Sequence, residues 1–161
     1  MGSSKSIISR GVADLYLLPE IDSKQTKNNA RKVLNPYRRL ARIAGRSLTD
    51  IKSPAITGMP RASSFGNSKE IKNTNVLSAA IEVDAIEQAV SNMSKECLEV
   101  IYFTYMSKEH HTKLDISGLV FGSLNAEKTV DRRLSDGLLQ FAEAYRGGKL
   151  LSFNKSNIYI N

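Results

Sequence analysis

Residues 125–148, NAEKTVDRRLSDGLLQFAEAYRGG, predict the helix around which the fold is built. Asn125 is a typical N-cap, and the pair Gly147-Gly148 is a typical helix end. Apolar side chains recur at spacings of three and four residues, which places them on one helix face. They are Val130, Leu134, Leu138, Phe141 and Tyr145. The first half is polar and basic, and beyond Gly137 the apolar set is too broad for one seam. We therefore expect a helix that begins exposed and ends packed against two surfaces, one of them a candidate homodimer contact.

A shorter helix is expected just before it, over residues 113–124, with a glycine-bearing end. Two helices joined by a tight turn, the second longer, are typical of the helix-turn-helix. Its second helix presents N-terminal residues to base edges in the major groove. Arginine can bind guanine bidentately, while lysine and threonine suit phosphates. The candidate DNA contacts on this helix are Lys128, Thr129, Arg132, Arg133 and Ser135. The competing interpretation is an amphipathic helix with a solvated charged face.

The chain upstream of this pair also predicts helices. Apolar side chains step by three and four residues from Val76 to Met93, and Ser94 can cap a further helix. Residues 46–74 are punctuated by proline and glycine, which indicates a linker or an irregular connection. We therefore expect an all-α fold. Its expected parts are an irregular N-terminal segment (1–19), a basic helical segment (20–46), a linker (47–74), a helix-turn-helix DNA-binding domain (75–148) and a C-terminal tail (149–161), which is either a short strand or a loose end.

Positive charge is concentrated near the N-terminus. Residues 20–46 carry eight lysines and arginines against two acidic residues, whereas residues 75–146 carry seven against eleven. Asn35-Pro36 interrupts the helical pattern, so we expect helices over residues 23–34 and 36–45. The candidate phosphate contacts here are Arg31, Arg38, Arg39, Arg42 and Arg46. They would supply salt-dependent affinity for DNA of any sequence, and the linker would let both parts of the chain reach adjacent sites. The alternatives are a merely solvated basic helix and a helix that binds an acidic face of RNA polymerase.

Composition limits the class of protein. A chain of 161 residues with a net charge of +7 and a pI near 9.6 favours a polyanionic partner. The lone cysteine, Cys97, excludes an internal disulfide and suits a reducing compartment, and we expect neither a signal peptide nor a membrane span. His110-His111 lacks the ligand spacing of a metal site, and nucleophile-elbow and nucleotide-binding motifs are missing. We therefore expect a cytoplasmic protein that is not an enzyme and needs no cofactor or metal.

Three stretches together resemble one protein family. They are residues 18–54, LPEIDSKQTKNNARKVLNPYRRLARIAGRSLTDIKSP, residues 93–106, MSKECLEVIYFTYM, and residues 128–151, KTVDRRLSDGLLQFAEAYRGGKLL. In this combination the chain resembles the ArpU-type late transcription regulators of phages of Gram-positive bacteria. The resemblance implies a C-terminal part similar to region four of bacterial sigma factors. It also implies a recognition helix that starts around Ala126 and a role in activating packaging and lysis genes late in infection. Gly118 and Gly122 depart from the family pattern, which favours better helix formers there.

These observations lead to one functional hypothesis with two rivals. We expect a sequence-specific, DNA-binding transcription regulator that activates phage late genes in the bacterial cytoplasm. Its expected partner is double-stranded DNA, with host RNA polymerase and a second copy of the chain as further candidates and no membrane. The first rival is a small terminase subunit that recognises packaging sites. The second is a helical adaptor that binds an acidic protein surface and no DNA.

Overall fold

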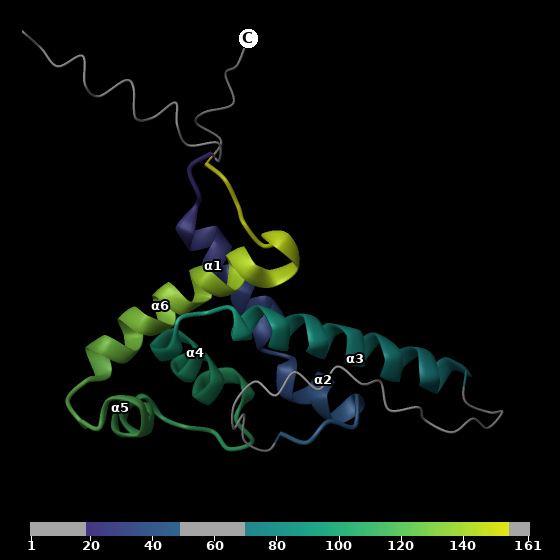
Figure 1. Ribbon diagram of the computed structural model, residues 1–161, viewed down its shortest axis with the longest axis horizontal. Helices are drawn as coiled ribbons and strands as arrows, with labels where there is room; N and C mark the ends of the chain where they lie inside the picture. The colour runs from purple at the N-terminus through teal and green to yellow at the C-terminus, as the bar shows by residue number, and fades with distance from the viewer. Residues whose placement is uncertain (1–18, 49–69, 155–161) are drawn as a thin grey trace, which may run out of the picture.

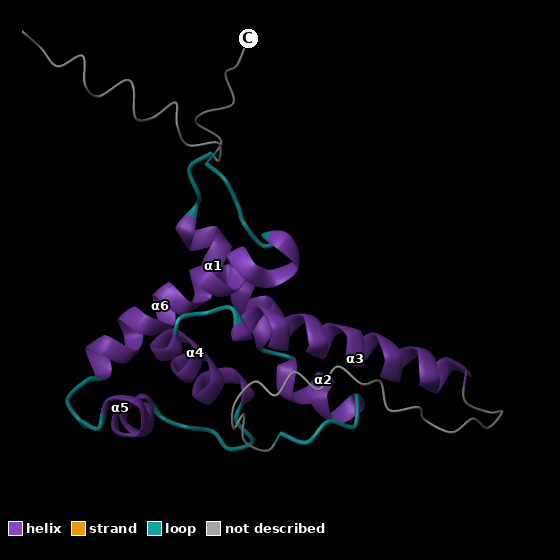
Figure 2. Cartoon of the chain, viewed as in Figure 1, coloured by secondary structure: helices purple, strands orange, loops and turns teal. Residues whose placement is uncertain are grey.

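The structure, a computed structural model, describes residues 19–48 and 70–154, without the side chains of residues 70–72 (Figure 1). These ranges consist of helices and loops, so the prediction of an all-α fold is confirmed (Figure 2). One isolated antiparallel bridge joins Ile21 to Phe153 and holds the two ends of the described chain together. Most of the expected irregular N-terminal segment, residues 49–69 of the expected linker and residues 155–161 of the tail lie outside the described residues.

The helices are short except for two. In chain order they are α1 (Ser23–Leu34), α2 (Tyr37–Ile43), α3 (Glu70–Ser91), α4 (Lys95–Ile101), the π-helical turn η3 (Tyr102–Met106), α5 (Lys113–Phe121), α6 (Glu127–Ala144) and the 3₁₀ turn η4 (Tyr145–Gly147). The predicted range of the first helix is confirmed. The second helix ends before the predicted residue 45, because Gly45 adopts a left-handed conformation with φ +69°.

Two predicted helix starts differ from the structure. α3 begins at Glu70, so residues 70–74, which were expected in the linker, are helical. Ala126, not Asn125, occupies the N-cap position of α6, and no side chain caps its first turn. The N–H of Ala126 instead donates to the Oγ of Ser117, at 3.0 Å, so α5 fixes where α6 begins.

α6 forms the centre of the packing. It contacts α1 and α4 most extensively and also touches α5 and α3. Leu138, Phe141 and Ala142 are fully buried, which confirms that the second half of this helix is anchored in protein. Most of the buried side chains around them are aliphatic, and they come from every helix except α5. Burying an aliphatic or aromatic side chain contributes about 1.5–3 kcal/mol, so this cluster dominates the stability of the fold.

The basic helices belong to this same core. Ala30 and Leu34 of α1 and Tyr37 and Ala41 of α2 are buried in one cluster with residues of α3, α4 and α6. Figure 1 shows α1 crossing α6 and α2 lying along α3. The expected linker therefore does not separate residues 23–43 from the other helices, onto which they pack. That the two parts of the chain reach adjacent sites stays a prediction.

Gly137 lets α4 approach α6 closely. A Cβ atom at this position would lie 3.0 Å from Cγ1 of Ile101, 3.3 Å from Cε of Met93 and 3.4 Å from Cβ of Cys97. Glycine is a poor helix former, and its place in the middle of α6 is explained by the contact. The two helices can thus cross at this distance because the residue at position 137 has no side chain.

Arg38 of α2 fastens the connection between η3 and α5. Its guanidinium donates to the carbonyl oxygens of Ser107 at 2.6 Å, Thr104 at 3.2 Å and Glu109 at 3.4 Å. The end of a helix leaves such carbonyls without partners, and here a side chain 66 to 71 residues away in sequence satisfies them. Burial lowers the pKa of Arg38, and the neighbouring Arg42 lowers it further.

We expect Gly137→Val to lower the free energy of unfolding by about 1–3 kcal/mol, because added methyl groups must displace Ile101, Met93 or Cys97 in a packed core. Glu143→Val on the exposed side of α6 is the matched control and should cost about 0.5 kcal/mol through helix propensity alone. Urea unfolding followed by circular dichroism measures both. Equal losses in the two variants would show that the close approach of α4 is unimportant.

We expect Arg38→Ala to cost about 1–3 kcal/mol, because it leaves half-buried carbonyl oxygens without donors. Arg39→Ala removes the same side chain one residue further on, where it is exposed, and should change stability by about 0.5 kcal/mol or less. Amide hydrogen exchange should also accelerate across residues 107–112 in the Arg38 variant alone. An Arg38 variant as stable as the Arg39 variant would contradict this role.

Candidate nucleic-acid interface

Side chains fix both the beginning of α5 and the turn that joins it to α6. Thr112 caps α5: its Oγ1 accepts from the Asp115 N–H at 3.2 Å, and the Asp115 carboxylate accepts from the Thr112 N–H at 2.8 Å. These hydrogen bonds hold the pKa of Asp115 below its usual value. The buried hydroxyl of Ser117 donates to the carbonyl of Ser123 and accepts from Ala126. Gly122 ends α5 with φ +65°, a conformation that favours glycine.

The first half of α6 exposes two cations that no described residue engages. Lys128 and Arg132 are both exposed, and neither forms an ion pair or hydrogen bond with any residue in the described ranges. Val130, between them in sequence, is buried against Val100 and Ile116 on the opposite side of the helix. The two side chains are thus available to an external partner, as predicted from the helical spacing.

The three other candidates on α6 are placed differently. Thr129 is half-buried. The Nε of Arg133 is shielded from solvent and lies 2.6 Å from the Glu96 carboxylate on α4. The Oγ of Ser135 accepts a hydrogen bond from Nζ of Lys27 on α1, at 3.0 Å. Arg133 and Ser135 therefore join α6 to neighbouring helices.

Two lysines that the sequence did not place beside α6 flank its exposed side. Nζ of Lys113, at the start of α5, lies 2.6 Å from Oδ1 of Asp131. Lys27 reaches Ser135 from α1, 108 residues away in sequence. Helical periodicity within one segment cannot show which residue of another helix will lie beside it. The position of Lys113 in the first turn of the preceding helix was the one available signal.

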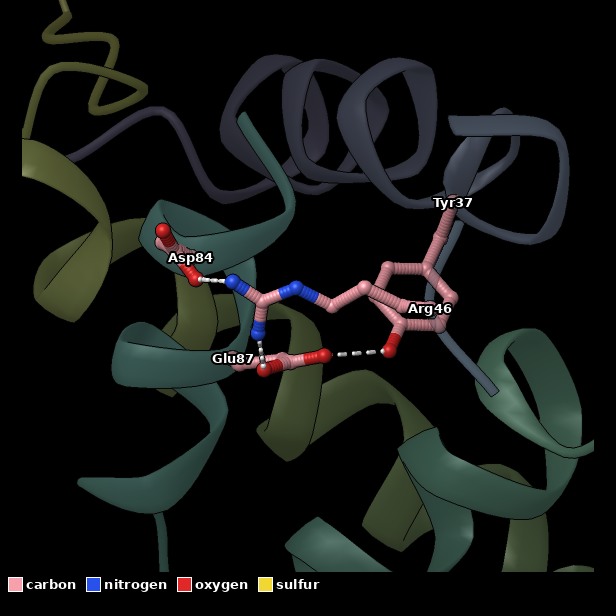
Figure 3. Close-up of polar contacts among 4 residues, drawn as sticks. All are labelled: Tyr37, Arg46, Asp84 and Glu87. Atoms are coloured by element: carbon pink, nitrogen blue, oxygen red, sulfur yellow. Dashed lines mark hydrogen bonds and ion pairs between the residues drawn. The ribbon is translucent and has the colours of Figure 1, made fainter. Parts of the chain in front are cut away.

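Two of the candidate arginines in the basic segment bind groups within the protein. They are Arg38 and Arg46. Arg46 forms ion pairs with Asp84 and with Glu87, the latter at 3.2 Å, and the hydroxyl of Tyr37 donates to the other oxygen of Glu87 at 2.8 Å (Figure 3). Burial and the Glu87 carboxylate raise the pKa of Tyr37, so the phenol keeps its proton. The network ties α2 and the residues after it to α3, while Arg38 is held by the backbone carbonyls between η3 and α5.

The remaining arginines of this segment are more accessible. Arg31 is exposed and donates to Oδ1 of Asn28 at 3.1 Å on its own helix. Arg39 and Arg42 of α2 are exposed, and their side chains form no hydrogen bond or ion pair with any residue in the described part of the chain. In Figure 1, α6 begins beside α5 at the left of the view, whereas α2 lies to the right beneath α3. The free cations therefore form two separate groups, one on α6 and one on α2.

Other kinds of site find no support in the described ranges. No group of three or more His, Cys, Asp or Glu residues there is arranged to hold a metal ion. His111 hydrogen-bonds with Ser107 at 3.1 Å and packs edge-on against Phe103, and His110 lies beside Arg38. None of the helices described is long and apolar enough to cross a membrane.

Two curated relatives match nearly the whole chain. A protein of Enterococcus hirae named "Putative autolysin regulatory protein ArpU" is 40% identical over 139 residues, which cover 86% of this chain and 99% of the relative. A protein of the same name from Streptococcus phage O1205 is 32% identical over 139 residues, which cover 84% of this chain and 97% of the relative. No family model and no solved structure matches. The family indicated by the sequence is thereby confirmed: the chain belongs to the ArpU-type family, whose relatives carry the name of autolysin regulatory proteins.

Proposed function

We propose that this protein is a sequence-specific DNA-binding transcription regulator in which α5 and α6 act as a helix-turn-helix. The observation that carries the proposal is the division of α6 into two halves. Lys128 and Arg132 are exposed and unengaged at its beginning, while Leu138 and Phe141 fix its end in the core. Such a helix can enter a major groove without losing its packing, because the residues that bind and the residues that anchor are separate.

The geometry of the turn supports the same proposal. Ser117, buried beneath the turn, bonds to the backbone on both sides of it, so the start of α6 is held in one position relative to α5. Base recognition requires that kind of precision, since hydrogen bonds to base edges depend on position within a few tenths of an ångström. Arg132 is the candidate for guanine, and Lys128 and Thr129 are candidates for phosphates.

The names of the relatives support a proposal for the target genes. The relatives are named for the regulation of an autolysin, and one of them comes from a phage. We propose that this chain activates the late genes of a phage, those for packaging and lysis, in the cytoplasm of a bacterial host. It would act without catalysis or cofactor, by placing itself on DNA where it can recruit RNA polymerase. In Figure 1, α2 lies away from the beginning of α6. Its exposed Arg39 and Arg42 would contact either flanking phosphates or the polymerase.

Two rivals make different predictions. A small terminase subunit also binds DNA but assembles into a ring, so its mass in solution would be many times 17.8 kDa. A monomer or dimer in sedimentation analysis therefore favours the regulator. A helical adaptor would bind an acidic protein and would retain no duplex in the selection described next.

We expect the full chain to enrich a defined motif from random-sequence duplexes, and Arg132→Gln to weaken binding to that motif about tenfold or more. Lys128→Gln should remove about one phosphate contact and so reduce the salt dependence of DNA binding. The slope of log K against log salt concentration should become shallower by ~0.9. Lys149→Gln removes an exposed lysine beyond the far end of α6 and is the matched control. Mobility shifts at several salt concentrations measure all three. Variants that bind like the wild type would refute the assignment of α6 as the recognition helix.

We expect the double variant Arg39→Gln/Arg42→Gln to flatten the salt dependence if α2 touches the flanking DNA, by about 0.9 in slope for each phosphate that is no longer neutralised. Both side chains are exposed and unengaged, so the fold should survive. Thermal denaturation by circular dichroism checks this. An unchanged slope would remove α2 from the DNA interface and leave RNA polymerase as its candidate partner.

A further inference from the structure

We propose that Asp131 reads a cytosine in the major groove and that Lys113 of α5 orients its carboxylate for this purpose. The inference rests on the proposed function of α5 and α6. An acidic residue on a DNA-facing helix normally opposes phosphate binding, so the presence of Asp131 beside Lys128 and Arg132 needs an explanation. The explanation offered by the geometry is base recognition.

The position of Asp131 on the helix comes first. With 3.6 residues per turn, Asp131 projects between Glu127 on one side and Lys128 on the other, all within an arc of roughly 140° that ends at Arg132. All four of these side chains are exposed, while Val130 and Leu138 point into the protein. Leu138, two turns after Asp131, projects only about 20° from it and is buried. Asp131 is exposed because it lies in the first turns of α6, and it occupies the side of the proposed DNA-binding surface that is nearer the buried stripe and Lys113 of α5.

The contact with Lys113 sets the orientation of the carboxylate. Nζ of Lys113 lies 2.6 Å from Oδ1 of Asp131, and both side chains are about half exposed (56% and 52%). Lys113 is the first residue of α5, where the reciprocal hydrogen bonds between Thr112 and Asp115 fix the backbone. No described residue binds Oδ2 of Asp131. One oxygen is thus held by the protein, its charge is partly offset, and the other oxygen is left to accept a hydrogen bond.

The base is selected by what each one presents in the major groove. A carboxylate can only accept hydrogen bonds, so it is repelled by the acceptor atoms of guanine and by O4 of thymine. Adenine offers the N6 amino group but places the acceptor N7 beside it. Cytosine offers its N4 amino group alone, which makes it the base that a carboxylate accepts best. The neighbouring Arg132 suits a guanine, so the two residues would read adjacent positions.

The test is selection from random-sequence duplexes by the full chain, with Asp131→Asn compared with wild type. Asparagine binds adenine through N6 and N7, so the motif should change from cytosine to adenine at one position, with a shift in relative preference of about tenfold or more. Glu143→Gln is the matched control. It removes one negative charge from an exposed position in the second half of α6, away from the proposed DNA-binding residues, and should leave the motif unchanged. Lys113→Met should keep the cytosine but reduce its preference severalfold.

Each outcome decides the matter. A changed or relaxed position in Asp131→Asn alone supports the proposal. An identical motif in wild type, Asp131→Asn and Glu143→Gln overturns it, even if both variants bind all duplexes more tightly through loss of negative charge. An unaltered preference in Lys113→Met overturns the orienting role of that lysine. If the wild type enriches no motif, the helix-turn-helix function itself fails and this inference with it, a result distinct from the loss of one position.

Discussion

The burial of the second half of α6 is the interaction on which the rest of the structure depends. Leu138, Phe141 and Ala142 are wholly covered by helices that are distant in sequence, so this single helix organises both the basic N-terminal helices and the acidic ones that follow. Because position 137 has no side chain, α4 packs closely against α6, and side chains around α4 lie against the backbone of α6. The orientation of the first half is then a consequence: once the apolar stripe is fixed, Lys128 and Arg132 must project away from the core. Binding and folding are thus carried by different turns of one helix, and substitutions at the exposed turns cost little stability.

The basic segment divides its arginines between two tasks. Arg38 and Arg46 bind backbone carbonyls and carboxylates within the protein, whereas Arg39 and Arg42, on the same short helix as Arg38, face solvent. For Arg39 this difference follows from helix geometry, since residues 38 and 39 point about 100° apart and only one of them can face η3. Arg42 projects to nearly the same side as Arg38 and lowers its pKa, but no described residue bonds its guanidinium. A concentration of positive charge in sequence is therefore not a measure of positive surface. The free cations that remain are fewer than the composition suggests, and they lie in two places.

Features of the fold that depend on neighbouring residues were predicted from the sequence. The side-chain contacts that depend on residues far away in the chain were not. The end of α1 before Asn35-Pro36 and the apolar stripe of α6 are set by local signals, namely a proline and a helical period. The helix expected over residues 113–124 ends three residues earlier, at Phe121, because Gly122 takes the left-handed conformation that ends a helix. The start of α3 at Glu70 was missed because residues 70–74 carry neither a cap nor a repeating apolar pattern. The partners of Arg38 and Arg46 lie 38 to 72 residues away, and those of Arg133 and Lys27 lie on other helices. A lone arginine in a sequence looks the same whether it will bind phosphate or a carbonyl.

The acidic excess of residues 75–146 is the strongest objection to a DNA-binding role, and the ion pairs answer much of it. Asp84 and Glu87 are paired with Arg46, Glu82 with Arg146, Glu96 with Arg133 and Asp131 with Lys113. Glu82 also accepts from the hydroxyl of Tyr145, and burial together with this carboxylate raises the pKa of that phenol to about 12. A carboxylate paired with a cation repels a phosphate only at short range, because the two charges largely cancel at a distance. Salt at about 0.1 M screens the remaining repulsion beyond about 10 Å. At the start of α6, an approaching phosphate therefore meets two unpaired cations and the unpaired Glu127, while the charge of Asp131 beside them is partly offset by Lys113. The local balance at the helix start is positive, although the net charge of the segment is not.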